Sequence, residues 1–204
     1  MSLVIAAAAV LWAAPSRADG RFTVLVIGDS LSAAYGMATE DGWVALLGER
    51  LAGRDIEVVN RSVSGDTTAG GAGRLGSALT GIRPDVVIIE LGANDGLRGI
   101  SPQATEDNLA RMIAMSREAG AHVLLLGMRM PPNYGPEYTE AFAAVFPRLA
   151  ERFDIALVPF FLEPVAEDWD MVQADGIHPN AAAQPLLLEH VWPRLAPLLP
   201  APAD

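Results

Sequence analysis

The stretch Phe22-Thr-Val-Leu-Val-Ile-Gly28-Asp29-Ser30-Leu31-Ser32 joins a run of apolar residues to a polar turn. Its centre, Val24 to Ile27, is apolar throughout, which is typical of a strand that is buried on both faces of a parallel sheet. Ser30 therefore follows the carboxyl end of a strand, where open α/β sheets bind their ligands. This stretch predicts both the kind of sheet and the place of a reactive hydroxyl.

Further apolar runs of strand length alternate with segments of helical length. The predicted strands are Phe22–Gly28, Ile56–Asn60, Asp85–Leu91, His122–Met128 and Ala156–Pro159. The predicted helices are Trp43–Leu51, Thr67–Thr80, Pro102–Ala119, Pro136–Phe153 and Asn180–Leu195. This alternation predicts an α/β three-layer sandwich with right-handed crossovers. No linker or internal repeat interrupts residues 19–204, so we expect one domain there.

The composition excludes several classes of function. The chain of 204 residues is long enough for a substantial core, and 51% hydrophobic with 19% charged residues is typical of a globular protein. A net charge of −11 argues against nucleic acid or an anionic membrane surface as a partner. The absence of cysteine excludes thiol catalysis, disulfides and thiolate zinc sites.

Residues 1–18 have the pattern of a signal peptide. Leu3 to Ala14 is a continuous apolar run of the right length, and Ser16-Arg17-Ala18 offers small residues at the −3 and −1 positions of a cleavage site. The run is too short to span a bilayer comfortably, and it departs from the usual pattern because no Lys or Arg precedes it. We expect a secreted or periplasmic mature chain from about Asp19, without a stable membrane span.

Three further polar segments follow a predicted strand or lie in the last long loop. They are Ser64-Gly65-Asp66-Thr67, Gly92-Ala93-Asn94-Asp95 and Asp175-Gly-Ile-His178-Pro179. Loops that follow successive parallel strands meet at one edge of the sheet, so the first two can share a crevice with Ser30. We therefore expect a single site that several loops build together.

The residue types in these segments suit nucleophilic catalysis by a hydroxyl group. His178 can remove the proton of Ser30 near neutral pH, and Asp175 can hold the imidazole in one tautomer through its other ring nitrogen. The backbone N–H groups of Ser30 and Gly65 and the carboxamide of Asn94 can donate to the oxyanion of a tetrahedral intermediate. The chemistry requires no cofactor, and no metal-ligand cluster is evident in the sequence.

In these motifs the chain resembles the SGNH or GDSL hydrolases, whose four signature residues match Ser30, Gly65, Asn94 and His178 in order. The stretches Gly28-Asp-Ser-Leu-Ser-Ala-Ala-Tyr-Gly36, Ser64-Gly-Asp-Thr67, Glu90-Leu-Gly-Ala-Asn-Asp-Gly-Leu-Arg-Gly99, Pro132-Asn-Tyr-Gly135 and Asp175–Asn180 resemble the bacterial arylesterase and periplasmic thioesterase–lysophospholipase branch. The resemblance covers essentially the whole mature chain.

The resemblance implies a flavodoxin-like sheet of five parallel strands in the order 2-1-3-4-5. It also implies hydrolysis of carboxylic esters and thioesters, including aryl esters, acyl thioesters and lysophospholipids, through an acyl-serine intermediate. Ser30, Asp175 and His178 are the implied triad, and Ser30, Gly65 and Asn94 the implied oxyanion hole. The implied partner is a small-molecule ester or thioester; the oligomeric state is left open.

Other interpretations of single motifs are weaker. Gly71-Ala-Gly73-Arg-Leu-Gly76 fits a dinucleotide-binding glycine pattern, but it begins about ten residues past the strand that it should follow. The order Ser, Asp, His is that of α/β-hydrolases, yet the chain has no Gly-x-Ser-x-Gly elbow. Asp29 is interpreted as a loop brace rather than an acid or base, and His122 and His190 as structural residues.

Three functions are open at this stage. The first is a secreted serine esterase, the second a carbohydrate acetylesterase or an acyltransferase with the same triad, and the third a lipid-binding protein that has lost catalysis. The complete set of catalytic groups argues against the third. For the acyl pocket we expect a wall of Leu31, Met130, Tyr134 and Phe142, because apolar side chains suit an acyl chain.

Overall fold

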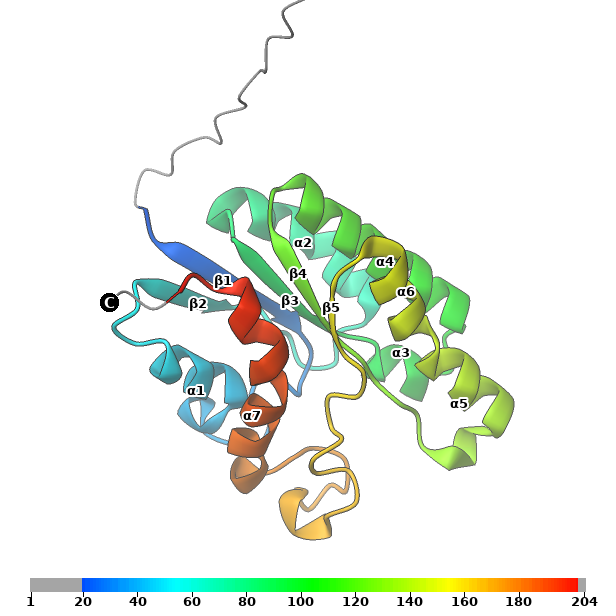
Figure 1. Cartoon of the computed structure of the whole chain (residues 1–204). Coiled ribbons are helices and arrows are strands. Elements are labelled where there is room, and N and C mark those ends of the chain that lie inside the picture. Colours follow the sequence, from blue (N-terminus) through cyan, green and yellow to red (C-terminus); the bar gives the residue numbers. More distant parts are fainter. Residues whose placement is uncertain (1–19, 202–204) are drawn as a thin grey trace, which may run out of the picture.

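The computed structural model describes residues 20–201 as a parallel sheet of five strands between two layers of helices (Figure 1). The strands are β1 (Phe22–Gly28), β2 (Ile56–Asn60), β3 (Val86–Glu90), β4 (His122–Leu126) and β5 (Ala156–Val158). Their order, β2-β1-β3-β4-β5, confirms the predicted sheet. The predicted signal peptide, residues 1–18, lies outside the described residues.

The central pair of strands is the most deeply buried part of the sheet. Every residue of β3 is buried, and in β1 all but Phe22 are. The two strands pair in register from Val24 opposite Val86 to Gly28 opposite Glu90. Because apolar and β-branched side chains fill both faces, helices must cover the sheet on both sides.

Residues 20–201 form seven α-helices around the sheet: α1 (Trp43–Arg50), α2 (Thr68–Ile82), α3 (Ala93–Leu97), α4 (Pro102–Glu118), α5 (Pro136–Ala143), α6 (Val145–Phe153) and α7 (Gln184–Leu195). α1 and α7 pack together on one face, and α2, α4 and α6 on the other (Figure 1). Among the helices of residues 20–201, none combines the length and the apolar character that crossing a bilayer requires.

Three helical predictions needed correction. The predicted helix Pro136–Phe153 is broken at Ala144, because Pro147 has no N–H to donate to the carbonyl of Ala143 and is tolerated only in the first turn of a new helix. The last helix begins at Gln184, after a short 3₁₀ turn that the Asn180 side chain caps. The helix α3 was not predicted at all.

The glycine pattern that resembles a dinucleotide loop lies inside α2 and serves packing. A Cβ atom on Gly71 would come within 2.3 Å of the Leu91 side chain, so this glycine lets the helix approach the sheet closely. The pattern opens no helix after a strand and therefore forms no phosphate loop.

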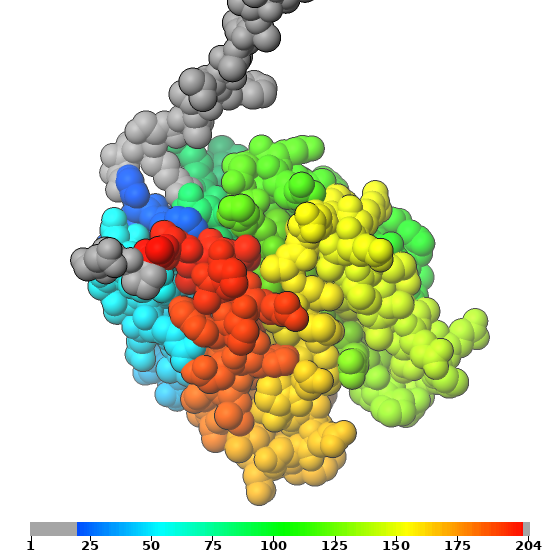
Figure 2. Space-filling model, viewed as in Figure 1, coloured from blue at the N-terminus to red at the C-terminus, as the bar shows by residue number. Residues whose placement is uncertain are grey.

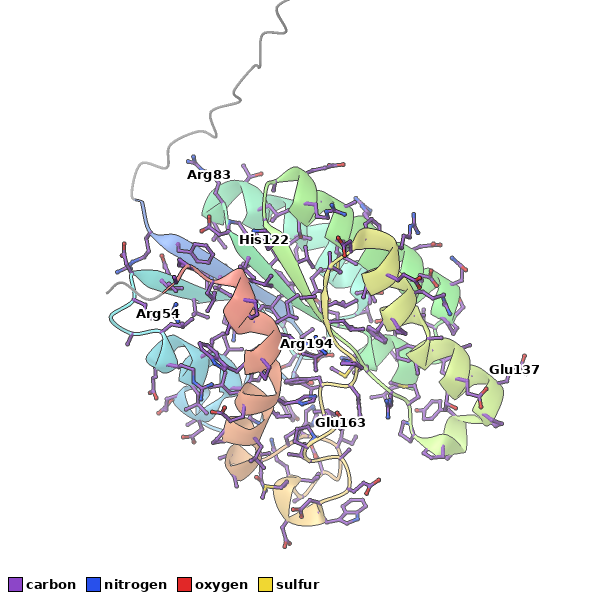
Figure 3. All side chains as sticks on the ribbon, viewed as in Figure 1. Arg54, Arg83, His122, Glu137, Glu163 and Arg194 are labelled. Carbon is purple, nitrogen blue, oxygen red and sulfur yellow. The ribbon has the colours of Figure 1, made fainter. Side chains whose placement is uncertain are left out.

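The loops that leave the carboxyl ends of the strands gather at one edge of the sheet. They lie along the lower edge in Figure 1, where residues 160–180 (yellow to orange) extend furthest. The space-filling view shows the same segment projecting below the two helical layers (Figure 2). His122, at the start of β4, lies at the opposite edge of the sheet (Figure 3).

Replacing Gly127 by Ala tests how tightly the loops at the carboxyl edge of the sheet are packed. A Cβ atom there would lie 2.3 Å from the carbonyl oxygen of Pro159, and the backbone of Gly127 is bonded to Val158 and Phe161. We expect the free energy of unfolding to fall by about 1–3 kcal/mol, as in other overpacked sites.

Gly73→Ala is the matched control for this substitution. Nothing lies within 4 Å of a Cβ at Gly73, and Ala is favoured over Gly inside a helix by about 1 kcal/mol. Urea unfolding should therefore show opposite signs for the two variants. Equal effects would show that the Gly127 contact is not limiting.

Candidate active site

The structure brings Ser30, His178 and Asp175 into one line of hydrogen bonds. Ser30 lies two residues after the end of β1, and its Oγ is 2.8 Å from Nε2 of His178. Nδ1 of the same imidazole is 2.6 Å from Oδ2 of Asp175. With Nδ1–H donating to the carboxylate, Nε2 is left as an acceptor for the Ser30 hydroxyl, which is the tautomer that a general base requires.

A tight turn between Asp175 and His178 prepares the carboxylate for this role. Oδ1 of Asp175 accepts the backbone N–H groups of Ile177, at 2.9 Å, and of His178, at 3.0 Å. The hydrogen bond from the backbone N–H of His178, then those from Ile177 and from the imidazole, lower the pKa of Asp175 to about 2. The carboxylate is therefore ionised throughout the neutral range. The Tyr35 ring contacts the imidazole, with 4.6 Å between ring centroids.

Three hydrogen-bond donors border the same cavity as the Ser30 hydroxyl. They are the backbone N–H groups of Ser30 and Gly65 and the carboxamide of Asn94, which lies in the first turn of α3. Within residues 20–201, neither backbone N–H donates to another protein group. Gly65 has a φ of +78°, a conformation that other residues adopt only with strain, and this turn sets the orientation of its peptide group. Donors free in this way suit a developing oxyanion.

The Asn94 carboxamide is held at both ends. Nδ2 donates to Oδ2 of Asp29 at 3.0 Å, and Oδ1 accepts from the Arg98 guanidinium at 3.3 Å. The same guanidinium nitrogen donates to the carbonyl of Gly65 at 2.9 Å. A carboxylate at one end and a guanidinium at the other determine which end carries the nitrogen, so the second N–H of Nδ2 is available to a ligand.

Asp95 connects the loop that carries Asn94 to the loop that carries Gly65. Its buried carboxylate accepts the backbone N–H of Thr68 at 2.8 Å and also bonds the Thr68 hydroxyl, at the start of α2. A negative charge there also suits the positive end of the helix dipole. The start of α2 is thereby held beside α3, which keeps Gly65 and Asn94 together.

A pair of buried carboxyl groups lies beneath the Ser30 loop. Asp29 and Glu90 are both fully buried; Oε2 of Glu90 accepts the Ser32 hydroxyl at 2.7 Å and the Asp29 N–H at 3.3 Å. The Ser32 hydroxyl in turn accepts Nε1–H of Trp43. Oε1 of Glu90 has no partner among the described residues.

The two carboxyl groups cannot both ionise at low cost. Burial raises the pKa of Asp29 to about 6, against hydrogen bonds from Leu31 and Asn94 that lower it. Burial, and then the charge of Asp29, raise the pKa of Glu90 well above its usual range. The pair therefore carries one negative charge at neutral pH, on Asp29, whose oxygens accept two N–H groups.

A cavity of about 590 Å³ opens above the Ser30 hydroxyl, a size typical of small-molecule sites. Its walls are mostly apolar. They include Leu31, Leu97, Met128, Met130, Pro131 and Leu162 beside the catalytic groups. Two of the four predicted wall residues, Leu31 and Met130, line it.

Tyr134 and Phe142 do not line the cavity, which corrects the prediction. Tyr134 donates its hydroxyl to the carbonyl of Leu97 and stacks with Tyr138. Phe142 is fully buried against Phe146, beneath Gly92. Phe142 lies in α5 on the side that faces the hydrophobic core, whereas Tyr134 lies in the short 3₁₀ turn before α5 and is held by its bond to Leu97.

Sequence reasoning missed Arg98 and Glu90 as parts of this site. Both lie in the quoted stretch Glu90–Gly99, and Glu90 ends a strand that is otherwise apolar. A charged residue at the buried end of a strand signals a polar contact beneath the loops, so this clue was available. Asp29 braces its loop as interpreted, and His190 bonds the carbonyl of Phe160, away from the cavity.

A serine, histidine and aspartate in line at the carboxyl edge of a parallel sheet, with free donors beside them, define a serine hydrolase of the flavodoxin-like type. The sequence matches the model of the GDSL-like lipase/acylhydrolase family over residues 26–185. The chain belongs to this family and is an ester hydrolase.

Named relatives and a solved structure agree with this assignment. Esterase TesA of Pseudomonas aeruginosa is 58% identical over 179 residues, covering 87% of this chain and 89% of the relative. Thioesterase 1/protease 1/lysophospholipase L1 of Escherichia coli is 45% identical over 183 residues, covering 90% and 88%. A crystal structure of TesA superposes with a TM-score of 0.84 at 58% identity, covering 87% of this chain and 99% of that one.

Glu90→Gln should make the protein more stable at high pH than at low pH, relative to the wild type. A raised pKa means that folded Glu90 keeps its proton while the unfolded chain releases it above the usual value of 4.5. The contribution of Glu90 is therefore complete below that value and is lost as the pH rises, whereas Gln has nothing to lose. Urea unfolding at about pH 5 and about pH 8 measures the difference.

Glu137→Gln is the control for the loss of one charge. Glu137 lies in the first turn of α5 and points away from the protein (Figure 3), so its variant should follow the wild type closely at both pH values. A Glu90→Gln difference that does not change with pH would contradict the buried neutral carboxyl.

Proposed function

We propose that the chain cleaves carboxylic esters and thioesters with apolar acyl groups through an acyl-Ser30 intermediate. The observation that carries the proposal is the line of hydrogen bonds from the Ser30 hydroxyl through His178 to Asp175. Ser30 and His178 line a cavity whose walls are largely apolar. Ser30 Oγ attacks the acyl carbon while Nε2 of His178 takes its proton. The imidazolium formed is stabilised by the ionised Asp175.

The oxyanion of the tetrahedral intermediate then accepts hydrogen bonds from the N–H groups of Ser30 and Gly65 and from Nδ2 of Asn94. His178 returns its proton to the departing alcohol oxygen or thiol sulfur, and the acyl group stays on Ser30. A water attacks the acyl carbon while His178 takes its proton. The tetrahedral intermediate then collapses: the bond to Oγ breaks, His178 returns the proton to Oγ, and the free acid and the Ser30 hydroxyl result.

The cavity favours this function over the two other acyl-transfer functions. A sugar acetylesterase needs polar groups that recognise hydroxyls, but the walls beside Ser30 are Leu31, Met128 and Met130. An acyltransferase must exclude water, yet the Asp175 side chain, which bonds His178, is 36% exposed. We take Leu31 and Met130 as contacts of the acyl chain.

The choice of substrates follows from the relatives and the cavity together. A thioesterase/lysophospholipase at 45% identity and an esterase at 58% support thioesters, lysophospholipids and simple esters as substrates of this chain. We also propose export from the cytoplasm. This rests on sequence alone, on the Leu3–Ala14 run and the Ser16-Arg17-Ala18 pattern, outside the described residues.

Ser30→Ala and Asp175→Asn test the mechanism on p-nitrophenyl esters of rising chain length, acyl-CoA and lysophospholipid. Ser30→Ala should lower kcat by about 10³-fold or more, and Asp175→Asn by about 10⁴-fold because the amide favours the wrong tautomer. Thermal unfolding confirms that each variant is folded. An activated ester should give a burst equal to the enzyme concentration.

Full turnover by a folded Ser30→Ala variant would exclude Ser30 as the nucleophile. Absence of the burst with intact turnover would mean either that acylation limits the rate or that no acyl-enzyme forms, and turnover in water–methanol mixtures decides between the two. Esters of one acid with different alcohols must give the same ratio of free acid to methyl ester if they share an acyl-Ser30 intermediate, so a ratio that changes with the alcohol contradicts the acyl-serine scheme.

Replacing Arg98 by Ala tests the proposed arrangement of the oxyanion hole. Because its guanidinium fixes Oδ1 of Asn94 and the carbonyl of Gly65, Arg98→Ala should lower kcat by about tenfold to a hundredfold and change KM little. Arg111→Ala removes the same charge from an exposed position of α4 and should change neither value.

A double-mutant cycle separates positioning from a merely structural role. In an Asn94→Ala background the carboxamide is gone, so Arg98→Ala should cost much less than it does in the wild type. Equal losses in both backgrounds would show that Arg98 does not act through Asn94.

A further inference from the structure

The exposed apolar residues of the protein gather around the mouth of the cavity. Within residues 20–201 six large hydrophobic side chains are strongly exposed, with relative exposures between 40% and 79%. Five of them are Tyr35, Val63, Leu97, Trp169 and Ile177; these we call the collar. The sixth, Leu186, lies in α7. Solvated apolar groups on a monomeric protein are usually scattered, so a cluster at one place indicates a contact surface.

The collar residues come from four separate loops at the carboxyl edge of the sheet. Tyr35 follows β1, Val63 follows β2, Leu97 ends α3 after β3, and Trp169 and Ile177 follow β5. Tyr35, Leu97 and Ile177 line the cavity itself. Trp169 and Val63 lie just outside the cavity. The Trp169 ring is 4.0 Å from a Cβ built on Gly176, and Val63 directly precedes Ser64; Gly176 and Ser64 both line the cavity.

We propose that the collar seats the enzyme on an assembled lipid surface without net negative charge, such as a micelle or bilayer of zwitterionic single-chain and double-chain phospholipids. The proposal rests on the proposed function, because an amphiphilic ester is the substrate that such a surface presents. A ring of apolar side chains around the opening lets the acyl chain pass from lipid to cavity without crossing water.

Charge selects the kind of surface. The chain carries a net charge of −11, has no lysine, and has three carboxylates next to Trp169, at Glu167, Asp168 and Asp170. An anionic surface would repel the acidic segment around Trp169, whereas a zwitterionic surface presents its cationic choline or ammonium groups outward. Trp169 itself is 79% exposed, and the amphipathic indole ring favours the boundary between lipid and water.

The test measures binding apart from catalysis. Ser30→Ala protein is mixed with phosphatidylcholine vesicles that contain lysophosphatidylcholine, and partitioning is followed by sedimentation and by tryptophan emission. We expect binding with a blue shift of the emission that is lost in a Ser30→Ala/Trp169→Ser protein, because Trp169 leaves water while the other three tryptophans, Trp12, Trp43 and Trp192, are present in both proteins. Vesicles with added phosphatidylglycerol should bind more weakly. Stronger binding to the anionic vesicles would overturn the proposed surface.

Trp169→Ser and Val63→Ser probe the two collar residues outside the cavity wall. Each should lower the partition coefficient, Trp169→Ser by about tenfold or more, and lower the rate on micellar lysophosphatidylcholine in proportion. Hydrolysis of dissolved p-nitrophenyl acetate should stay within about twofold of the wild type. Leu186→Ser removes an exposed apolar side chain outside the collar, 41% exposed against 50% for Val63, and should change neither property.

Several outcomes would overturn the proposed role of the collar in lipid binding. These are no partitioning of the Ser30→Ala protein, an equal loss of partitioning for Leu186→Ser and Trp169→Ser, or self-association that Trp169→Ser abolishes, which would assign the surface to a second copy of the chain. Since every variant carries the same Leu3–Ala14 segment, differences among them report the collar alone. Turnover by Ser30→Ala would contradict the mechanism instead, so the two failures are distinguishable.

Discussion

The hydrogen bond between the Asp29 carboxylate and the Asn94 carboxamide, 3.0 Å long, joins the two loops on which the site depends. It exists because β1 and β3 are neighbours that end together, with Gly28 opposite Glu90. Gly28 leaves no room for a side chain, since a Cβ would lie 2.8 Å from the Glu90 carboxylate and from the Ser32 side chain. The strand register therefore sets the distance between the Ser30 loop and the Asn94 carboxamide.

This junction costs stability. Two carboxyl groups are buried side by side where a hydrophobic pair would be cheaper, and the chain offsets the cost by keeping one of them neutral and giving the other two N–H donors. In exchange, the hydrogen bonds of the two carboxyl groups hold the Ser30 loop in one conformation. A hydroxyl that must stay 2.8 Å from Nε2 of His178, beside the Asn94 carboxamide, cannot rest on a mobile loop. The buried acids are a functional exception to apolar packing, beside the reacting groups.

Much of this arrangement is predictable from sequence, and the parts that are not share a cause. The strands are predictable because their apolar runs are local patterns in the sequence. Val24–Ile27 and the β3 run are typical of buried strands, and the pairing of these two strands brings Ser30 and Asn94 together. The break at Ala144 follows from Pro147 and could have been predicted, but the side on which α5 packs depends on tertiary contacts, so Phe142 was expected in the cavity although it fills the core. Arg98 has no motif of its own, since its role exists only once Gly65 and Asn94 are neighbours.

The loops at the carboxyl edge of the sheet have a polar inner side and an apolar outer side, and the two sides play different roles. On the inner side, polar groups bind loop to loop: Asn60 donates to the carbonyl of Ser32 at 2.7 Å, and Asp95 holds the start of α2. On the outer side, the same loops expose apolar residues such as Val63 and Leu97. The inner contacts join loop to loop, so changes there should alter the geometry of the site. The outer side chains are exposed, so substitutions there should leave the hydrogen bonds from Ser30 through His178 to Asp175 in place.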